Sequence, residues 1–145
     1  MEINLLGLIS SIEASIAILV SIFTWRRTSR IASYADIDSL YLELLKLGFA
    51  YPKFTEPNLT KDYKNRFTGD ELLSYQIYAF ILWNICETIY DRCGKGKDKD
   101  LWRTWEPVIV AENKLHRKWF DDPENFHKFK EEFRQFINAN YPKEY

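Results

Sequence analysis

The chain has only two histidines, His116 and His127. Glu112 lies four residues before His116, so a helix would place the carboxyl and imidazole groups on the same face. Such a pair can support general acid–base chemistry, or it can be a partly exposed contact within a helix. The sequence contains no HExxH motif and no GxSxG motif, so it does not support a zinc protease or a serine hydrolase.

A second group of charged residues, Glu87, Asp91 and Arg92, lies within one helical stretch. The group could form a buried polar site against another helix. The alternative is a solvated helix end, with ion pairs worth a few tenths of a kcal/mol each. These three residues, together with Glu112 and His116, are therefore candidates for a polar site, and none of them is predicted to be catalytic.

Three tryptophans, Trp102, Trp105 and Trp119, can stack on a nucleotide base, although at helical spacing they also suit a protein core. The GKGK stretch at residues 94–97 lacks the spacing of a phosphate-binding loop and predicts a hairpin turn. The two cysteines, Cys86 and Cys93, are expected to be reduced and buried. Neither a CxxC pair nor a His-rich tract occurs, so we predict no metal and no cofactor.

The elements that carry these residues are predicted to be helices. Apolar residues recur every three or four positions in four stretches, residues 37–48, 71–93, 101–120 and 123–140. Asp122 is expected to cap the last of them, with Pro123 in its first turn. Residues 51–69 contain two prolines and read as a long loop. The fold class is therefore all-α, with residues 31–145 forming a four-helix domain.

An apolar segment from Ile3 to Trp25 precedes this domain. About 20 apolar residues span a bilayer as a helix, so the segment predicts a transmembrane helix within residues 1–30. It lacks the basic start of a signal peptide, its apolar stretch is too long for one, and an arginine cluster follows it. The predicted membrane-interface residues follow at its end: Trp25, Arg26, Arg27 and Arg30.

The predicted membrane helix has two different sides. At about 100° per residue, small and polar residues gather on one side and large aliphatic residues on the other. The candidate pore or helix-contact residues are Gly7, Ser10, Glu13, Ala14, Ala17 and Ser21. Small residues let membrane helices approach closely, and an unpaired carboxylate such as Glu13 costs about 2.5–3.5 kcal/mol near the bilayer centre. We therefore expect the helix to self-associate, around either a conducting pore or a dry bundle.

The basic cluster also predicts a topology. Positive charges favour the cytoplasmic side, so the N-terminus is expected outside and the helical domain in the cytoplasm, with the protein in a bacterial inner membrane. The net charge of −1 gives no basic field of the kind that attracts nucleic acid. The expected partners are further copies of this chain, membrane lipid, and either a cytosolic defence protein or a nucleotide signal.

One membrane helix followed by a four-helix cytosolic domain resembles the accessory membrane protein of type VI CRISPR systems. The resemblance covers the whole chain at the level of architecture. It implies a HEPN-like domain and assembly into ring-shaped membrane pores that enhance antiviral defence. HEPN nucleases use an arginine shortly before a histidine. Here the nearest stretch, Asn113-Lys114-Leu115-His116, has no such arginine.

The sequence thus predicts a non-enzymatic, homo-oligomeric membrane protein that forms a pore or perturbs the membrane in bacterial defence, regulated by its helical domain. Two alternatives remain open. One is a membrane-tethered binding or regulatory module without a pore. The other is a degenerate HEPN-like ribonuclease that uses His116 near Glu112.

Overall fold

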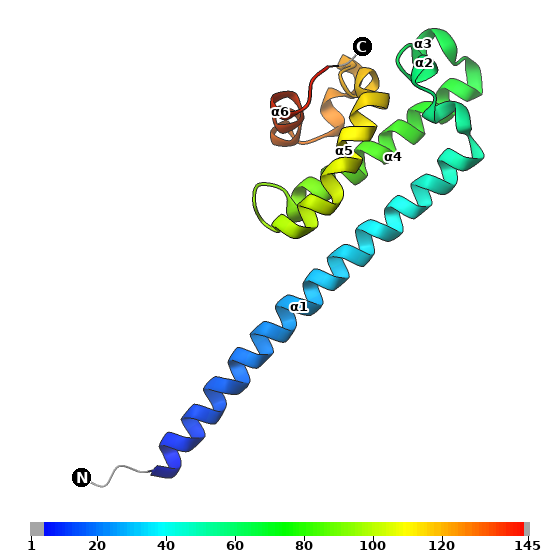
Figure 1. The fold of residues 1–145 in the computed structure, drawn as a ribbon. Coiled ribbons are helices and arrows are strands. Elements are labelled where there is room, and N and C mark those ends of the chain that lie inside the picture. The colour runs from blue at the N-terminus through cyan, green and yellow to red at the C-terminus, as the bar shows by residue number, and fades with distance from the viewer. Residues whose placement is uncertain (1–4, 144–145) are drawn as a thin grey trace. The chain divides into compact units, whose positions relative to one another are not determined.

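The computed structural model describes residues 5–143, and the side chains of residues 15–32 and 34–143. Every regular element in this part of the chain is helical and none is a strand, which confirms the all-α class (Figure 1). The elements in chain order are α1 (Leu5–Ala50), η1 (Pro52–Thr55), α2 (Pro57–Thr60), α3 (Tyr63–Arg66), α4 (Gly69–Cys93), α5 (Lys99–Phe120), η2 (Pro123–Lys128) and α6 (Glu131–Asn140).

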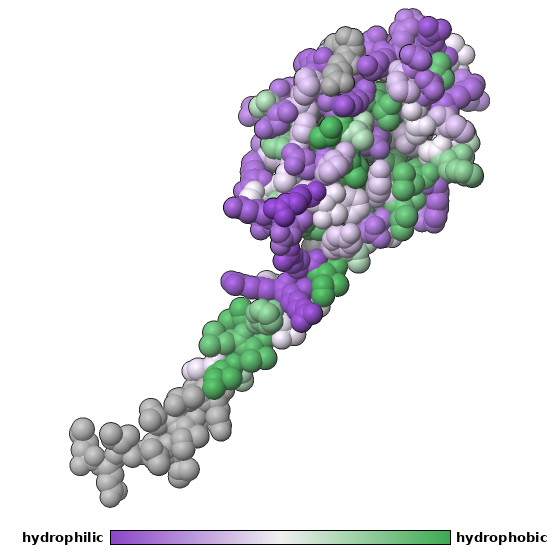
Figure 2. Space-filling model, viewed as in Figure 1, coloured by the Kyte–Doolittle hydropathy of each residue, from purple (hydrophilic) through white to green (hydrophobic). Residues whose placement is uncertain are grey.

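Helix α1 has 46 residues, and no glycine or proline lies between Gly7 and Gly48 to interrupt it. The chain divides into two compact units, residues 1–36 and residues 37–145. In the first unit, the large apolar side chains from Ile16 to Trp25 are exposed, and the arginines at positions 26 and 27 follow them. Figure 2 shows this change from hydrophobic to strongly hydrophilic residues along α1.

Within the described part of the chain, no helix combines the length and the apolar character that crossing a bilayer requires. The predicted span begins at Ile3, and the side chains of Gly7, Ser10, Glu13 and Ala14 lie outside the described residues. Ala17 and Ser21 are described, and both are exposed on α1. The membrane helix and its small-residue face therefore stay predictions.

The core of the second unit is built around α4, which packs along α5 (Figure 1). Trp83 on α4 is fully buried and stacks on Phe120 of α5, with ring centroids 4.1 Å apart. Tyr90 at the far end of α4 packs against Phe133 of α6, with ring centroids 5.4 Å apart. The second unit's part of α1 contributes the buried Ile37 and Leu44 and the half-buried Tyr41, whose ring meets Trp105 edge-on. Cys86 and Cys93 are free and buried, as predicted.

The segment predicted as a loop, residues 51–69, instead folds into η1, α2 and α3, so that prediction was wrong. Each of its two prolines opens a short helical turn, where the missing N–H has no intrahelical partner to lose. The turns are held by aromatic side chains: Phe54 lies edge-on to Phe67, and both rings contact Tyr75 of α4. Buried aromatic contacts of this kind outweigh the turn-forming tendency of the local sequence.

The last predicted helix, residues 123–140, is broken in two. Asp122 accepts a hydrogen bond from the Glu124 amide and Pro123 opens the element, as predicted, but that element is the short 3-10 helix η2. The chain is then extended at Phe129, and α6 begins only at Glu131. The break lets Phe129 pack against Phe120, with ring centroids 5.3 Å apart, while Phe126 remains 47% exposed.

Candidate functional site

The predicted pair Glu112 and His116 lies inside the helical domain, on the face of α5 that meets α4. The imidazole is 0% exposed, and its Nε2 lies 3.6 Å from the Glu112 carboxylate. Its Nδ1 lies 3.0 Å from the hydroxyl of Tyr75. Nε2 has no hydrogen-bond partner among the described residues, and which of Tyr75 and Nδ1 donates in their hydrogen bond depends on the tautomer of the imidazole.

Burial sets the charge of both groups. It raises the pKa of Glu112 from 4.5 to about 7, and it lowers the pKa of His116 from 6.5 to about 3. Tyr41 of α1 and Tyr78 and Cys86 of α4 also interact electrostatically with the Glu112 carboxyl. Between about pH 3 and pH 7 the pair is therefore uncharged and needs no counter-ion, which suits its apolar surroundings.

This geometry limits the chemistry available to the pair. A general acid or base must come within hydrogen-bond reach of its substrate, and the described side chains enclose the His116 ring completely. Trp83 also donates from its indole nitrogen to the His116 carbonyl at 3.3 Å, which ties α4 to α5 at this point. The pair is a contact within α5, as one reading of the sequence had it, but it is buried rather than partly exposed.

The structure separates the remaining predicted polar residues from this pair. Glu87 and Asp91 lie at the end of α4 and hold the start of α6: Glu87 accepts from the Lys130 amide at 2.8 Å, and Asp91 pairs with the Lys130 ammonium. Tyr78 marks the position on α4 that lies beside Glu112, and Glu87 is nine residues further on, about 13 Å along the helix axis. The five candidate polar residues therefore fall into two separate groups. Arg92 is half-buried at this end of α4.

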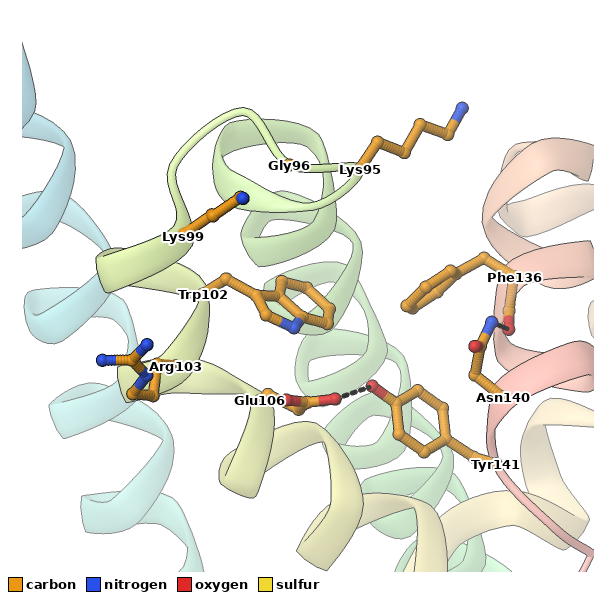
Figure 3. Close-up of a pocket in the computed structure, with 9 residues that line it drawn as sticks. All are labelled: Lys95, Gly96, Lys99, Trp102, Arg103, Glu106, Phe136, Asn140 and Tyr141. Carbon is orange, nitrogen blue, oxygen red and sulfur yellow. Dashed lines mark hydrogen bonds between the residues drawn. The ribbon is translucent and has the colours of Figure 1, made fainter.

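A cavity of about 390 Å³ lies at the side of the domain where α5 and α6 meet (Figure 3). Its wall includes two aromatic rings, Trp102 of α5 and Phe136 of α6, whose centroids are 5.6 Å apart in an edge-on arrangement. Tyr141, just after α6, donates a hydrogen bond to Glu106 at 3.3 Å. The complete lining is Lys95, Gly96, Lys99, Trp102, Arg103, Glu106, Phe136, Asn140 and Tyr141.

Charged groups stand at the two ends of this cavity. Lys95, in the turn before α5, pairs with Glu132 at 2.7 Å. Lys99 lies at the start of α5 next to Trp102, and Arg103 points away from the two aromatic rings (Figure 3). No carboxylate of the described residues forms an ion pair with Lys99. The cavity thus combines aromatic walls with a cationic end and a carboxylate end.

The sequence identified only part of this cavity. Of the three tryptophans named above, Trp105 and Trp119 are core residues, and only the half-buried Trp102 reaches the cavity. Lys99, Arg103 and Glu106 were missed, although a signal existed: with Trp102 they occupy positions i, i+3, i+4 and i+7 of one helix face. Tyr141 gave no such signal because its contact with Glu106 spans 35 residues.

Comparison with known proteins gives no relationship: no protein-family model, curated protein or solved structure matches this chain. Among the described residues, no three histidine, cysteine or acidic side chains come together in a way that could hold a metal ion.

Proposed function

We propose that this chain is a membrane-anchored protein of a bacterial inner membrane. It self-associates through the first part of α1, the apolar stretch that ends at Trp25. The observation that carries the proposal is the set of exposed apolar side chains on that part of the helix. Phe23, for example, is 69% exposed, and six large apolar residues are exposed from Ile16 to Phe23. Large apolar patches on a soluble monomer are uncommon, whereas lipid accepts such side chains.

The residues that follow support the same proposal. Trp25 and the arginines at 26, 27 and 30 form an aromatic and basic border of the kind found at the cytoplasmic face of membranes. This border would set the helical domain in the cytoplasm and bind anionic headgroups, at about 1 kcal/mol for each basic residue. The N-terminus would then lie outside.

Self-association is supported by the composition of the two sides of the helix. Ala17 and Ser21 lie on one side, with Leu19 and Phe23 on the other, and all four side chains are exposed. In lipid, the small side allows another helix to pack closely, and serine can donate a hydrogen bond across the contact. The carboxyl of Glu13, on the edge of the small side in the sequence pattern, would gain a polar environment there.

We expect disulfide crosslinking to follow this two-sided pattern. In membranes containing the full chain, Ala17→Cys and Ser21→Cys should give mainly crosslinked dimers on mild oxidation. Leu19→Cys and Phe23→Cys, on the lipid-facing side, should stay near background. The native cysteines add little background, because both are buried. Equal crosslinking at all four positions, or none at positions 17 and 21, would contradict self-association through this face.

An assembly of this kind either encloses a pore or forms a closed bundle. Dye release from liposomes containing the protein separates the two arrangements, and a lumen lined by Glu13 requires that Glu13→Leu change the release. The resemblance described above links the pore arrangement to antiviral defence, which remains a proposal.

One observation favours a second candidate function, a membrane-tethered binding module. The cavity beside Trp102 provides a binding surface within residues 37–145, and it does not depend on α1 self-association. The stoichiometry of the full chain in mild detergent discriminates between the two functions: several subunits favour the assembly, and a monomer favours the module. A ribonuclease using His116 is not proposed, because the imidazole is enclosed.

A further inference from the structure

The cavity between α5 and α6 has an aromatic wall that a flat ligand can use. Trp102 and Phe136 are both half-buried, so each keeps part of its ring surface open to the cavity. Their edge-on contact at 5.6 Å leaves no room for a ring between them, so a ligand ring would lie on the open surface of one of them. Stacking of a nucleobase on an aromatic side chain is worth about 1–3 kcal/mol.

The cationic end of the cavity suits an anion. Lys95, Gly96 and Lys99 border it, and the backbone is left-handed at Lys95 and Gly96, with φ of 55° and 76°. Lys95 forms an exposed ion pair with Glu132, and its side chain extends away from Trp102 (Figure 3), so Lys99 is the lysine beside the aromatic wall. Lys99 has no such competing partner among the described residues.

The opposite end of the cavity presents a hydrogen-bond acceptor. One Glu106 oxygen accepts the Tyr141 hydroxyl proton, and a carboxylate has further lone pairs for ligand N–H groups. Glu106 lies seven residues after Lys99, which is about 10 Å along the helix axis. That separation matches the length of a nucleoside monophosphate from the edge of its base to its phosphate.

We propose that this cavity binds a nucleoside phosphate whose base presents N–H donors, of which guanine is the best match. The phosphate lies at Lys99, the base lies against Trp102 or Phe136, and Glu106 accepts from the base. Guanine carries two adjacent donors, N1–H and the 2-amino group, that a carboxylate can accept together. The volume of about 390 Å³ falls within the range of about 300–1,000 Å³ for small-molecule pockets. The proposal does not depend on membrane insertion.

The test is calorimetric titration of the full chain in detergent with GMP, IMP, guanosine and inorganic phosphate. IMP differs from GMP only by the missing 2-amino group, so it should bind about tenfold more weakly, because loss of one charge-assisted hydrogen bond has this effect. Glu106→Gln should remove that difference between the two ligands. Lys99→Gln should weaken the binding of GMP about tenfold and leave the binding of guanosine, which has no phosphate, unchanged.

Lys114→Gln is the matched control, since Lys114 is an exposed lysine of α5 outside the cavity lining, and it should bind GMP like the wild type. Circular dichroism checks that each variant is folded. Three results would overturn the proposal: no binding of GMP at millimolar concentration, equal affinity for GMP and inorganic phosphate, or equal GMP binding by the wild type and Lys99→Gln.

Discussion

Replacing Arg117 with methionine is expected to destabilise the helical domain by about 3–5 kcal/mol, because the change removes one side of a buried, charge-assisted network. The Arg117 side chain is 2% exposed. It donates to Asp121 at 2.8 Å, to Asn113 at 3.0 Å, to the Tyr141 carbonyl at 3.2 Å and to Asn138. Without the guanidinium, the buried Asn113 side chain and Tyr141 carbonyl lose this donor, and Asp121 keeps its ion pair with the exposed Lys143.

Urea denaturation of the full chain measures this effect, with Arg103→Met as the control. Arg103 is an exposed arginine of the same helix, so its replacement should change the free energy of unfolding by less than about 0.5 kcal/mol. Equal stability of the two variants would show that the Arg117 network contributes nothing. Because the network fixes the Tyr141 backbone, Arg117→Met should also disturb the Glu106 side of the cavity.

Glu112→Gln is expected to make the protein more stable than the wild type at pH 8, with the advantage shrinking as the pH falls to 5. The folded wild type holds the Glu112 proton until about pH 7, whereas the unfolded chain releases it near pH 4.5. The unfolded state therefore binds fewer protons in this window, so wild-type stability falls as the pH rises through it. The difference between the variants should change by about 3 kcal/mol from pH 5 to pH 8.

The pKa shift of His116 changes stability with pH in the opposite direction. Its pKa is near 3 in the folded state and 6.5 in the unfolded chain, so it adds stability as the pH rises from 3 to 6.5. Both proteins contain His116, so its effect cancels in their difference. Denaturation curves at a series of pH values measure that difference, and Glu131→Gln, at an exposed position, should follow the wild type. A pH-independent difference would mean that Glu112 titrates like an exposed carboxyl.

The sequence predicted α4 most closely because its apolar stripe has an unbroken helical period and ends at a glycine turn. The predicted stretch, residues 71–93, differs from Gly69–Cys93 only at its start. Its inward residues, including Tyr75, Leu82 and Ile89, are fully buried. Periodicity succeeds here because one face of the helix is buried along its whole length.

Periodicity failed where tertiary contacts decide the backbone. Phe126, Phe129 and Phe133 have helical spacing, yet Asn125 donates to the Trp119 carbonyl at 2.7 Å and holds η2 against the end of α5. The chain then has to become extended before α6 can start. The spacing of apolar residues predicts helices, but it does not predict a hydrogen bond from a side chain to the backbone of the preceding helix.

For the candidate sites too, the sequence predicted local spacing but not tertiary contacts. The i, i+4 spacing correctly placed Glu112 and His116 on one helix face, but spacing does not tell whether that face meets solvent or α4. Arg117 gave no signal as a buried residue, because arginine is usually exposed and its partners Asn138 and Tyr141 are more than 20 residues away.

The central claim is that the first part of α1 resides in a lipid bilayer, and flotation of the full chain with liposomes tests it most directly. The wild type should float with the vesicles and stay bound in high salt, because apolar burial holds it there rather than charge alone. Ile16→Arg should reduce flotation strongly, since Ile16 lies near the centre of the predicted span from Ile3 to Trp25 and a charge there costs about 2.5–3.5 kcal/mol on insertion scales. A wild-type chain that stays in the dense fractions, soluble without detergent, would contradict the account.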